Sequence, residues 1–177
     1  MTRKFWITSN LLAENFGMMS VEEVALLKSC ASKLTYQSIV VNIGANVGTS
    51  ALAILEVTEK STIFSIDIKP CPEERENIIN SGHTAYSVIR ILGDSTRVVL
   101  GWNPKIEIDL LFVDGNHSEE ALRRDFEWVN FVRKGGFVLF HDYDHPNLPY
   151  MKPVILEFMK DHQLLGTERF LIAFQKA

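Results

Sequence analysis

Five short runs of almost entirely apolar residues alternate with segments of helical periodicity, and this alternation limits the fold more than any other feature. The apolar runs occupy 38–43, 61–68, 86–92, 108–114 and 137–143. Strands with so few polar residues are buried on both faces, which happens when helices cover both sides of a parallel sheet. The sequence therefore predicts an α/β fold built on a doubly wound, mainly parallel sheet.

The segments between these runs have helical spacing. They cover 20–34, 49–60, 72–81, 95–102, 118–134 and 153–161. Ser20 and Glu23 have the spacing of a capping box and mark the start of the first helix. Gly135 and Gly136 are expected to end the helix over 118–134, because glycine commonly follows a helix C-terminus. The last residues, 169–176, predict a hairpin with an antiparallel C-terminal strand.

Length and charge suggest how the chain is organised and what it binds. The 177 residues predict one domain, with an N-terminal cap and helix over 1–35 and a core over 36–177. With 18 basic against 22 acidic residues, no cationic field is expected to attract a nucleic acid. Two isolated cysteines and no apolar span fit a cytoplasmic protein without a membrane contact. The sequence thus predicts neither a nucleic-acid nor a membrane partner.

Ligands of such folds lie beyond the carboxyl ends of the strands, so the residues that follow each strand are the candidates for a site. The first strand is followed by Gly44 and Gly48, which let the chain turn sharply and approach a ligand closely. A dinucleotide fingerprint would need glycine at Asn46 and Thr49, and a phosphate-binding P-loop would need a lysine. An NAD-type oxidoreductase is therefore only an alternative.

Two carboxylates fit a bound nucleoside. Asp67 ends the second strand and is placed to accept hydrogen bonds from ribose hydroxyls. Asp94 follows the third strand and could bond an exocyclic amine such as that of adenine. Its structural alternative is to cap the next helix, a role that Ser95 could also fill.

Over about residues 36–161 the sequence resembles the class I S-adenosylmethionine-dependent methyltransferases. The stretch "FVDGNHSEEALRRDFEWVNFVRKGGFVLFHDY" (112–143) resembles the branch of macrocin-type O-methyltransferases and cephalosporin-biosynthesis proteins. The resemblance implies a Rossmann-like sheet and S-adenosyl-L-methionine as cofactor. The cofactor-binding residues expected by position are Asn42, Gly44, Ala45, Asn46, Gly48, Ser50, Asp67, Asp94, Ser95 and Asp114.

One position departs from the family pattern. The family usually has a carboxylate two residues before the first glycine, where it helps to hold the cofactor's amino group, and this chain has Asn42. A neutral amide lacks the charge-assisted part of that hydrogen bond, commonly about 1 kcal/mol. Weaker cofactor binding is expected.

Residues after the fourth and fifth strands are the candidates for the chemistry. His117 and His141 are candidate general bases, with a helix cap and a buried strand end as their structural alternatives. The resemblance implies Mg²⁺ at Asp114 and Asp142. Tyr143 stands where a third oxygen ligand commonly follows, so Asp144 or water would have to replace it.

The sequence predicts methyl transfer to a small-molecule acceptor, at oxygen. A non-catalytic relative that has lost the transfer step is the alternative that Asn42 and Tyr143 keep open. Aromatic residues and methionines in the N-terminal segment 4–20, and Tyr150 in the loop before the last predicted helix, are expected to cover the acceptor pocket or to form a homodimer contact.

Overall fold

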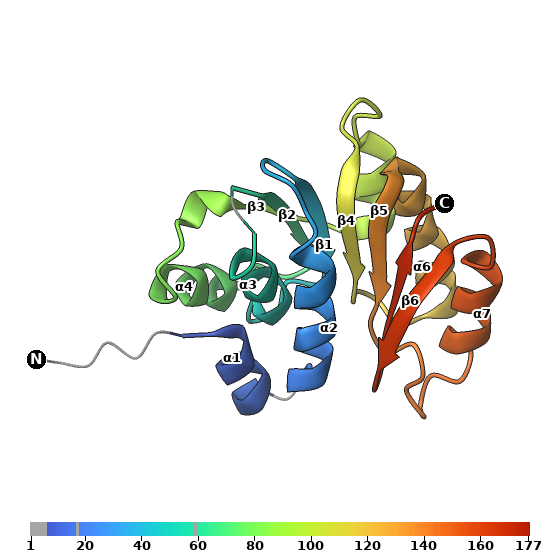
Figure 1. The fold of residues 1–177 in the computed structure, drawn as a ribbon, viewed down its shortest axis with the longest axis horizontal. Coiled ribbons are helices and arrows are strands. Elements are labelled where there is room, and N and C mark those ends of the chain that lie inside the picture. Colours follow the sequence, from blue (N-terminus) through green and yellow to red (C-terminus); the bar gives the residue numbers. More distant parts are fainter. Residues whose placement is uncertain (1–6, 17, 59) are drawn as a thin grey trace, which may run out of the picture.

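A computed structural model describes residues 7–16, 18–58 and 60–177. Within these ranges seven strands form one sheet in the order β3-β2-β1-β4-β5-β7-β6 (Figure 1). The strands are β1 (Ile39–Ile43), β2 (Thr62–Asp67), β3 (Val88–Leu92), β4 (Ile108–Val113), β5 (Val132–Phe140), β6 (Gln163–Glu168) and β7 (Leu171–Gln175). Strands β1 to β5 are parallel to one another, whereas β7 is antiparallel to both β5 and β6. The predicted fold class is confirmed.

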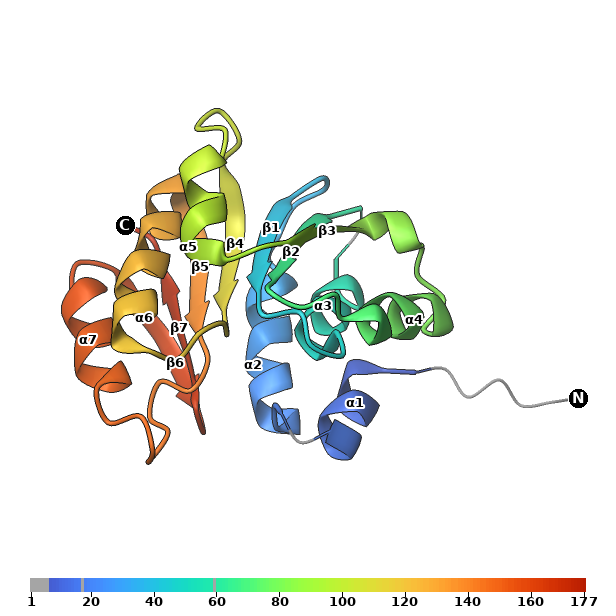
Figure 2. The same ribbon diagram turned by 180° about the vertical axis from the view of Figure 1, so that it is seen from behind.

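Helices cover both faces of the sheet. The helices α1 (Ser9–Phe16), α2 (Val21–Ala31), α3 (Thr49–Leu55) and α4 (Pro72–Asn80) share one hydrophobic core with the sheet (Figure 1). On the opposite face lie α5 (Ser95–Val98), α6 (Glu119–Asp125) and α7 (Met151–Phe158) (Figure 2). Consecutive strand residues alternate between the two cores, as Leu110 and Leu111 do, because side chains of a strand point to opposite faces. This double burial explains the apolar runs.

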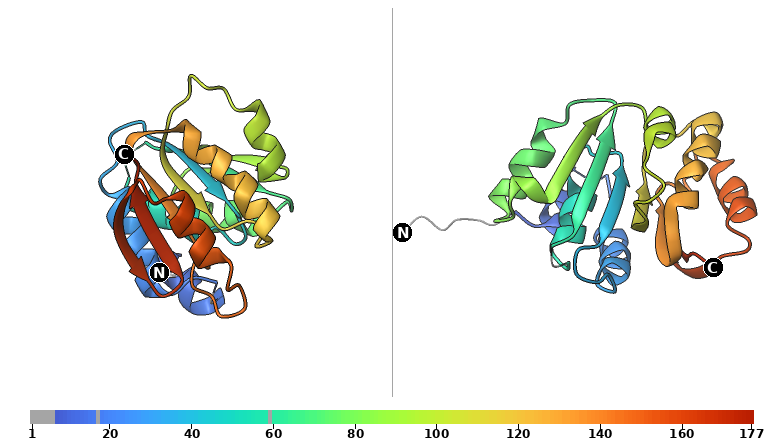
Figure 3. Two further views of the ribbon diagram at one scale, coloured as in Figure 1. Left: turned by 90° about the vertical axis from the view of Figure 1, so that its right-hand side faces the viewer. Right: turned by 90° about the horizontal axis from the view of Figure 1, so that it is seen from above.

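The C-terminal hairpin β6–β7 lies beside α2 (Figure 3). Its turn is joined to that helix because the backbone N–H of Phe170 donates to the Glu23 carboxylate at 2.8 Å. Glu23 also completes the predicted capping box: its carboxylate accepts from the Ser20 N–H, and the Ser20 hydroxyl oxygen accepts from the Glu23 N–H. The start of α2 is therefore fixed to the far edge of the sheet.

The predicted long helix over 118–134 is wrong in its second half. Helix α6 ends at Asp125, a 3₁₀ helix covers Phe126–Phe131, and β5 begins at Val132. Gly135 and Gly136 do not end a helix but lie inside β5, where the pairing with β4 is irregular. A Cβ on Gly136 would lie 2.7 Å from the Val132 side chain and 3.0 Å from the Asp109 carbonyl oxygen, so the bulge favours glycine.

Other boundaries differ by a few residues. The helix predicted over 20–34 ends at Ala31, that over 49–60 ends at Leu55, and the last helix begins at Met151 instead of 153. Helix α1 was not expected, since the segment around it has no clear apolar periodicity. Residues 1–6, part of the predicted N-terminal cap, lie outside the described residues. In the described ranges every helix is too short or too polar to reach across a lipid bilayer.

Asp125 supplies a pH test of this packing. Its carboxylate is 1% exposed and accepts a hydrogen bond from the Ser95 hydroxyl at 2.7 Å. Burial raises the pKa of Asp125 from 3.8 to about 6. The folded state thus holds the proton longer than the unfolded state does, and stability falls as pH rises from about 4 to about 6, by about 2 to 3 kcal/mol.

Asp125→Asn keeps an acceptor for Ser95 but cannot ionise. The variant is expected to lack this loss of stability, so its free energy of unfolding rises relative to the parent protein between pH 4 and pH 7. Urea unfolding at both pH values measures the difference. Parallel pH dependences in the two proteins would contradict the assignment.

Candidate functional site

The loop after β1 is held against the end of β4. Gly44 has a φ of +90°, and a Cβ added there would lie 2.0 Å from the Asp114 carbonyl oxygen. The Asp114 N–H in turn donates to the Ile43 carbonyl at 2.9 Å. Only glycine permits this approach. The two strands whose connections leave the sheet in opposite directions, β1 and β4, therefore end in direct backbone contact, and such a switch point is where α/β folds bind ligands.

Asp67, at the end of β2, binds the same loop from the other side. Its carboxylate accepts from the backbone N–H groups of Ala45 at 2.9 Å, Asn46 at 3.4 Å and Lys69 at 2.8 Å. Burial opposes ionisation, but these hydrogen bonds outweigh it and lower the pKa of Asp67. A cavity of about 300 Å³ opens beside it, lined by Ala45, Ser65, Asp67, Lys69, Pro70, Arg90, Ile91 and Leu92.

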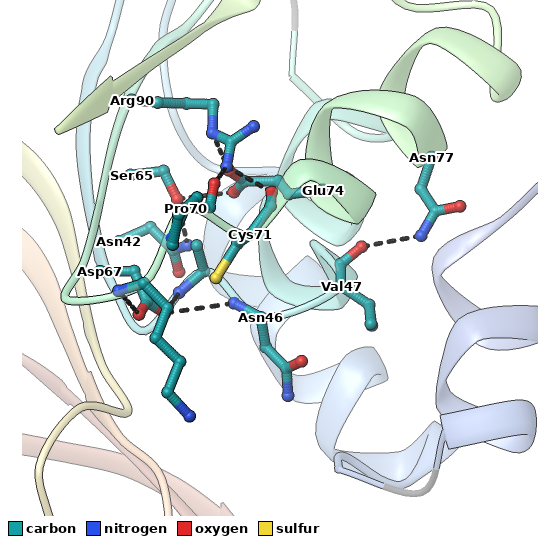
Figure 4. A network of polar contacts seen from close by, with 12 residues as sticks. Asn42, Asn46, Val47, Ser65, Asp67, Pro70, Cys71, Glu74, Asn77 and Arg90 are labelled. Carbon is teal, nitrogen blue, oxygen red and sulfur yellow. Dashed lines mark hydrogen bonds and ion pairs between the residues drawn. The ribbon is translucent and has the colours of Figure 1, made fainter. Parts of the chain in front are cut away.

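A chain of buried polar groups lies beneath the loop (Figure 4). Ser50 donates to the Asn42 amide oxygen at 2.9 Å, and the Asn42 amide nitrogen donates to Ser65 at 3.1 Å. Ser65 donates to Glu74 at 2.6 Å, and Glu74 pairs with Arg90 at 3.1 Å. Asn42 and Glu74 are 0% exposed. Every hydrogen bond in this series is donated in the same direction, from Ser50 through Asn42 and Ser65 to the Glu74 carboxylate.

Asn42 is therefore engaged on both sides of its amide. The structure places it below the loop, with Ser50 and Ser65 as its partners, and not on the surface of the crevice. Helix α4 supports the loop as well: a Cβ on Gly48 would lie 2.9 Å from the Glu74 side chain, and Asn77 donates to the Val47 carbonyl at 2.9 Å (Figure 4). The negative charge under the loop comes from α4.

Asp94 has the capping role in this structure. Its carboxylate accepts from the N–H and the hydroxyl of Thr96, at 3.0 and 2.8 Å, at the start of α5. Ser95 does not share that role, because its hydroxyl donates to buried Asp125. These hydrogen bonds lower the pKa of Asp94, so the exposed carboxylate is ionised. Neither residue lines the cavity beside Asp67.

Four side chains converge beyond β4 and β5. The Asp142 Oδ2 atom lies 2.9 Å from His117 Nε2 and 3.4 Å from His141 Nδ1. The Asp114 Oδ1 atom lies 3.3 Å from His117 Nε2 and 3.4 Å from His141 Nδ1. The four strand-end candidates of the sequence thus form one cluster.

The charges of this cluster are coupled. Hydrogen bonds to Asp114 and Asp142 raise the pKa of His117 to about 9. Burial would lower the pKa of His141, but Asp114, Asp142 and Glu23 more than reverse that effect. Burial would raise the pKa of Asp142, and the two imidazoles instead lower it. Without a bound cation, both imidazoles are therefore protonated at neutral pH.

Two other expected participants lie elsewhere. Tyr143 is 9% exposed and packs into the core on the α6–α7 side. Asp144 pairs with Lys152 at 2.7 Å on the surface, so it does not replace Tyr143 as a third carboxylate or oxygen donor. His117 takes that place, because one ligand atom each of Asp114, His117 and Asp142 lie within 4.8 Å of one another.

A larger cavity, of about 480 Å³, opens over this cluster. Its walls are Ala13, Glu14, Met18, Met19, Ser20, Val21, Glu22, Glu23, Asp114, His117, His141, Asp142, His145, Arg169 and Phe170. The N-terminal segment thus covers the site, as its methionines suggested. Phe5 and Trp6 lie outside the described residues. Tyr150 does not line this cavity; it packs beside the core of the α6–α7 face.

Glu23 is the site residue that the sequence did not reveal. Its Oε1 atom lies 3.6 Å from His141 Nε2, on the side of the ring away from Asp114 and Asp142. The nearby His141 imidazole and hydrogen bonds from the Ser20 and Phe170 N–H groups outweigh the effect of burial and lower the pKa of Glu23. The local pattern identified Glu23 only as a capping residue. Its side chain is 3% exposed, and the burial of a carboxylate at a helix start is the signal that marks a second role.

Comparison with known proteins agrees with this geometry. A family model described as a methyltransferase domain matches residues 41–143, which include the glycine loop, Asp67 and the four-residue cluster. The match covers more than half of the chain, and the chain therefore belongs to this methyltransferase family.

Two curated relatives match shorter parts. A fibrillarin-like rRNA/tRNA 2′-O-methyltransferase of Methanococcus aeolicus is 28% identical over 100 residues, which are 55% of this chain and 42% of that protein. An uncharacterized protein of Acanthamoeba polyphaga mimivirus is 36% identical over 58 residues, 32% of this chain and 26% of that protein. The chain thus spans less than half the length of either relative.

Solved structures show the same fold. The O-methyltransferase TomG of Streptomyces achromogenes, determined with S-adenosylmethionine, has a TM-score of 0.73 at 14% identity and covers 96% of this chain and 88% of its own. An rRNA methylase of Streptococcus thermophilus has a TM-score of 0.68 at 14% identity and covers 89% and 98%. The sheet is therefore the Rossmann-like fold that binds this cofactor in methyltransferases.

These comparisons correct one expectation. The charge balance of the sequence predicted no nucleic-acid partner, and that prediction is contradicted, because proteins similar to this chain include rRNA methylases. The prediction failed because it was based on the net charge of the chain. A net charge of −4 is an average over the whole surface, whereas an RNA contact depends on the local surface around a site.

The series of buried hydrogen bonds under the loop predicts how stability changes when a carboxylate is introduced at Asn42. Asn42→Asp replaces the amide donor to Ser65 by a second acceptor, so two carboxylates compete for one hydroxyl proton. We expect a loss of about 2 to 4 kcal/mol in the free energy of unfolding. Adding Glu74→Gln supplies a donor to Ser65 and reverses the direction of the chain.

The double variant is therefore expected to be more stable than Asn42→Asp alone by at least about 1 kcal/mol, a coupling that urea unfolding of all four proteins measures. If the losses of stability in Asn42→Asp and Glu74→Gln simply add in the double variant, the two residues do not share the Ser65 hydroxyl proton as described.

Proposed function

We propose that the protein transfers the methyl group of S-adenosylmethionine to a hydroxyl oxygen. The observation that carries the proposal is the position of Asp114. Its backbone is in contact with Gly44 in the glycine loop, and its carboxylate lines the 480 Å³ cavity. One residue thus borders both the crevice expected for the cofactor and the cavity expected for the acceptor.

The cofactor occupies the crevice along the ends of β1 and β2. Gly44 to Ser50 hold the methionine part, and Gly44 and Gly48 have no Cβ to block its close approach. Asp67 accepts hydrogen bonds from the ribose, and Asp94 lies at the adenine end of the crevice with Ser95 behind it. Asn42 acts through Ser50, on which the position of the loop depends.

The acceptor occupies the larger cavity. Methyl transfer from a sulfonium is an in-line displacement: the acceptor oxygen forms a bond to the methyl carbon while the carbon–sulfur bond breaks, and the hydroxyl proton has to leave. Asp114, which borders both crevice and cavity, lies in a cluster of titratable side chains with His117, His141 and Asp142. His117 or His141 receives this proton only after losing its own, because the carboxylates of the cation-free cluster keep both imidazoles protonated at neutral pH.

Two classes of acceptor fit an oxygen target. The cavity volume lies in the range of sites for small ligands, and the branch that the sequence resembles methylates small molecules. A ribose hydroxyl of RNA is the second candidate, which the similarity to a 2′-O-methyltransferase favours. In both cases the methyl group goes to oxygen.

Calorimetry tests the cofactor. We expect S-adenosylmethionine and S-adenosylhomocysteine to bind with micromolar dissociation constants and NAD to show no binding. Asp67→Ala is expected to weaken binding by about 1 to 3 kcal/mol, because it removes hydrogen bonds to both ribose and loop. Asp144→Ala, an exposed carboxylate outside the crevice, is the matched control. Binding of NAD alone would favour the oxidoreductase alternative, and unchanged affinity in Asp67→Ala would remove Asp67 from the site.

Transfer of a labelled methyl group tests the acceptor. The protein is incubated with methyl-labelled cofactor and with either an RNA or a small-molecule fraction of a cell extract. We expect label at hydroxyl oxygen in one fraction, and a loss of most turnover in Asp142→Asn with cofactor affinity nearly unchanged. Cofactor binding without label in either fraction would favour the non-catalytic alternative.

A further inference from the structure

We propose that Asp114, His117, His141 and Asp142 form a mixed nitrogen–oxygen site for a divalent first-row transition ion, in place of the magnesium site that the family resemblance implies. The proposal rests on the proposed function only in its location, because metal binding is measurable without cofactor or acceptor. It concerns which ion this chain selects and which residues hold it.

The donor atoms of the four side chains converge on one point. A single oxygen atom of each carboxylate, Asp114 Oδ1 and Asp142 Oδ2, faces a single nitrogen atom of each imidazole, His117 Nε2 and His141 Nδ1. The four oxygen–nitrogen distances are 2.9, 3.3, 3.4 and 3.4 Å. Metal–ligand bonds of about 2.1 Å that meet at about 90° to 109° place neighbouring ligand atoms about 3.0 to 3.4 Å apart. Ligand atoms of Asp114, His117 and Asp142 lie within 4.8 Å of one another, as in a coordination shell, and His141 Nδ1 lies beside both carboxylates.

His141 is buried without a hydrogen-bond partner among the described residues. Its side chain is 5% exposed, and neither ring nitrogen makes a hydrogen bond of acceptable geometry. A buried polar group without such a partner is costly, and unexplained cases in native proteins point to an absent ion or water. Nδ1 faces the space between Asp114 and Asp142, where an ion would sit.

A buried carboxylate, that of Glu23, lies next to the second ring nitrogen of His141. Glu23 Oε1 lies 3.6 Å from Nε2, the nitrogen that faces away from the cluster. Histidine ligands of metals commonly donate their second ring N–H to a carboxylate, which fixes the tautomer and the ring orientation. Glu23 is itself fixed by the N–H groups of Ser20 and Phe170. Glu23 therefore lies on one side of the His141 ring, and the proposed ion position lies on the other side.

The backbone at Asp142 supports the same conclusion. Asp142 has a φ of +57°, a left-handed conformation that costs energy for a residue with a side chain. Such strain persists where the surrounding structure imposes it, and it is concentrated at ligand sites. Here the strained residue is one of the two carboxylates of the cluster.

Magnesium does not suit this donor set. Mg²⁺ binds through oxygen, and the described part of the protein supplies no oxygen donor here beyond the two carboxylates: Tyr143 is in the core and Asp144 pairs with Lys152. Imidazoles occupy the remaining positions. Mixed imidazole and carboxylate ligands are typical of first-row transition ions, which bind nitrogen more strongly than Mg²⁺ does.

The test is titration of the metal-free full chain with Mn²⁺, Zn²⁺ and Mg²⁺, each alone, by calorimetry. We expect one site that binds Mn²⁺ and Zn²⁺ at least tenfold more tightly than Mg²⁺. Electron paramagnetic resonance of bound Mn²⁺ is expected to show nuclear modulation from directly coordinated imidazole nitrogen. This signal is independent of methyl transfer.

Three variants locate the site. His117→Ala and Asp142→Asn are each expected to weaken Mn²⁺ binding at least tenfold. Glu23→Gln is expected to weaken it by about ten- to a hundredfold, because the amide no longer carries the charge that orients His141. Its single oxygen can accept from only one of the Ser20 and Phe170 N–H groups, so the stability of this variant is measured separately by urea unfolding. Asp144→Asn is the matched control and is expected to bind Mn²⁺ as the parent protein does. Circular dichroism of each variant checks that it is folded.

The outcomes separate this proposal from the proposed function. Equal or tighter binding of Mg²⁺, absence of imidazole nitrogen in the Mn²⁺ spectrum, or unchanged affinity in folded His117→Ala would overturn the metal site and leave cofactor binding untouched. Loss of cofactor binding with retention of the Mn²⁺ site would overturn the proposed function and leave the metal site standing.

Discussion

The contact between the Gly44 backbone and the Asp114 carbonyl is the constraint on which the site depends. It exists because Gly44 has no Cβ, and it joins the ends of β1 and β4 at the point where the chain changes direction across the sheet. The glycine loop, fixed there, is open to a ligand on the side of Asp67. The Asp114 carboxylate is directed to the other side, into the cavity under the N-terminal helices. The cofactor crevice and the acceptor cavity therefore lie on opposite sides of this backbone contact.

Two buried carboxylates outside the strand ends hold the two sides in place. Glu74, on α4, receives the hydrogen-bond chain that begins at Ser50 and so supports the loop. Glu23, on α2, connects the helix start, the β6–β7 turn and His141. Glu23 accepts hydrogen bonds from two backbone N–H groups, and Glu74 has the Ser65 hydroxyl and the Arg90 guanidinium as partners, as a carboxylate removed from water requires. The helices on this face are thus part of the site as well as of the core.

The sequence predicted the sheet because burial on both faces leaves a direct record in apolar runs, and it placed Asp114, His117, His141 and Asp142 together because parallel strands end at one edge. It misjudged the residues around Gly135 and Gly136, whose glycines serve a bulge that only the pairing with β4 reveals. It also missed Glu23, which lies 118 positions before His141 in the chain and meets it only through the packing of α2. Local patterns identify caps and strand ends, whereas contacts between distant elements depend on the folded arrangement.

The most direct test of the account is a crystal structure of the protein with S-adenosylhomocysteine. The account predicts the ribose hydroxyls at Asp67, the amino-acid part against Gly44 to Ser50, and the sulfur directed past Asp114 toward the cavity that contains His117 and His141. A ligand bound elsewhere, or one whose sulfur is directed away from that cavity, would contradict the central claim that Asp114 lies between cofactor and acceptor.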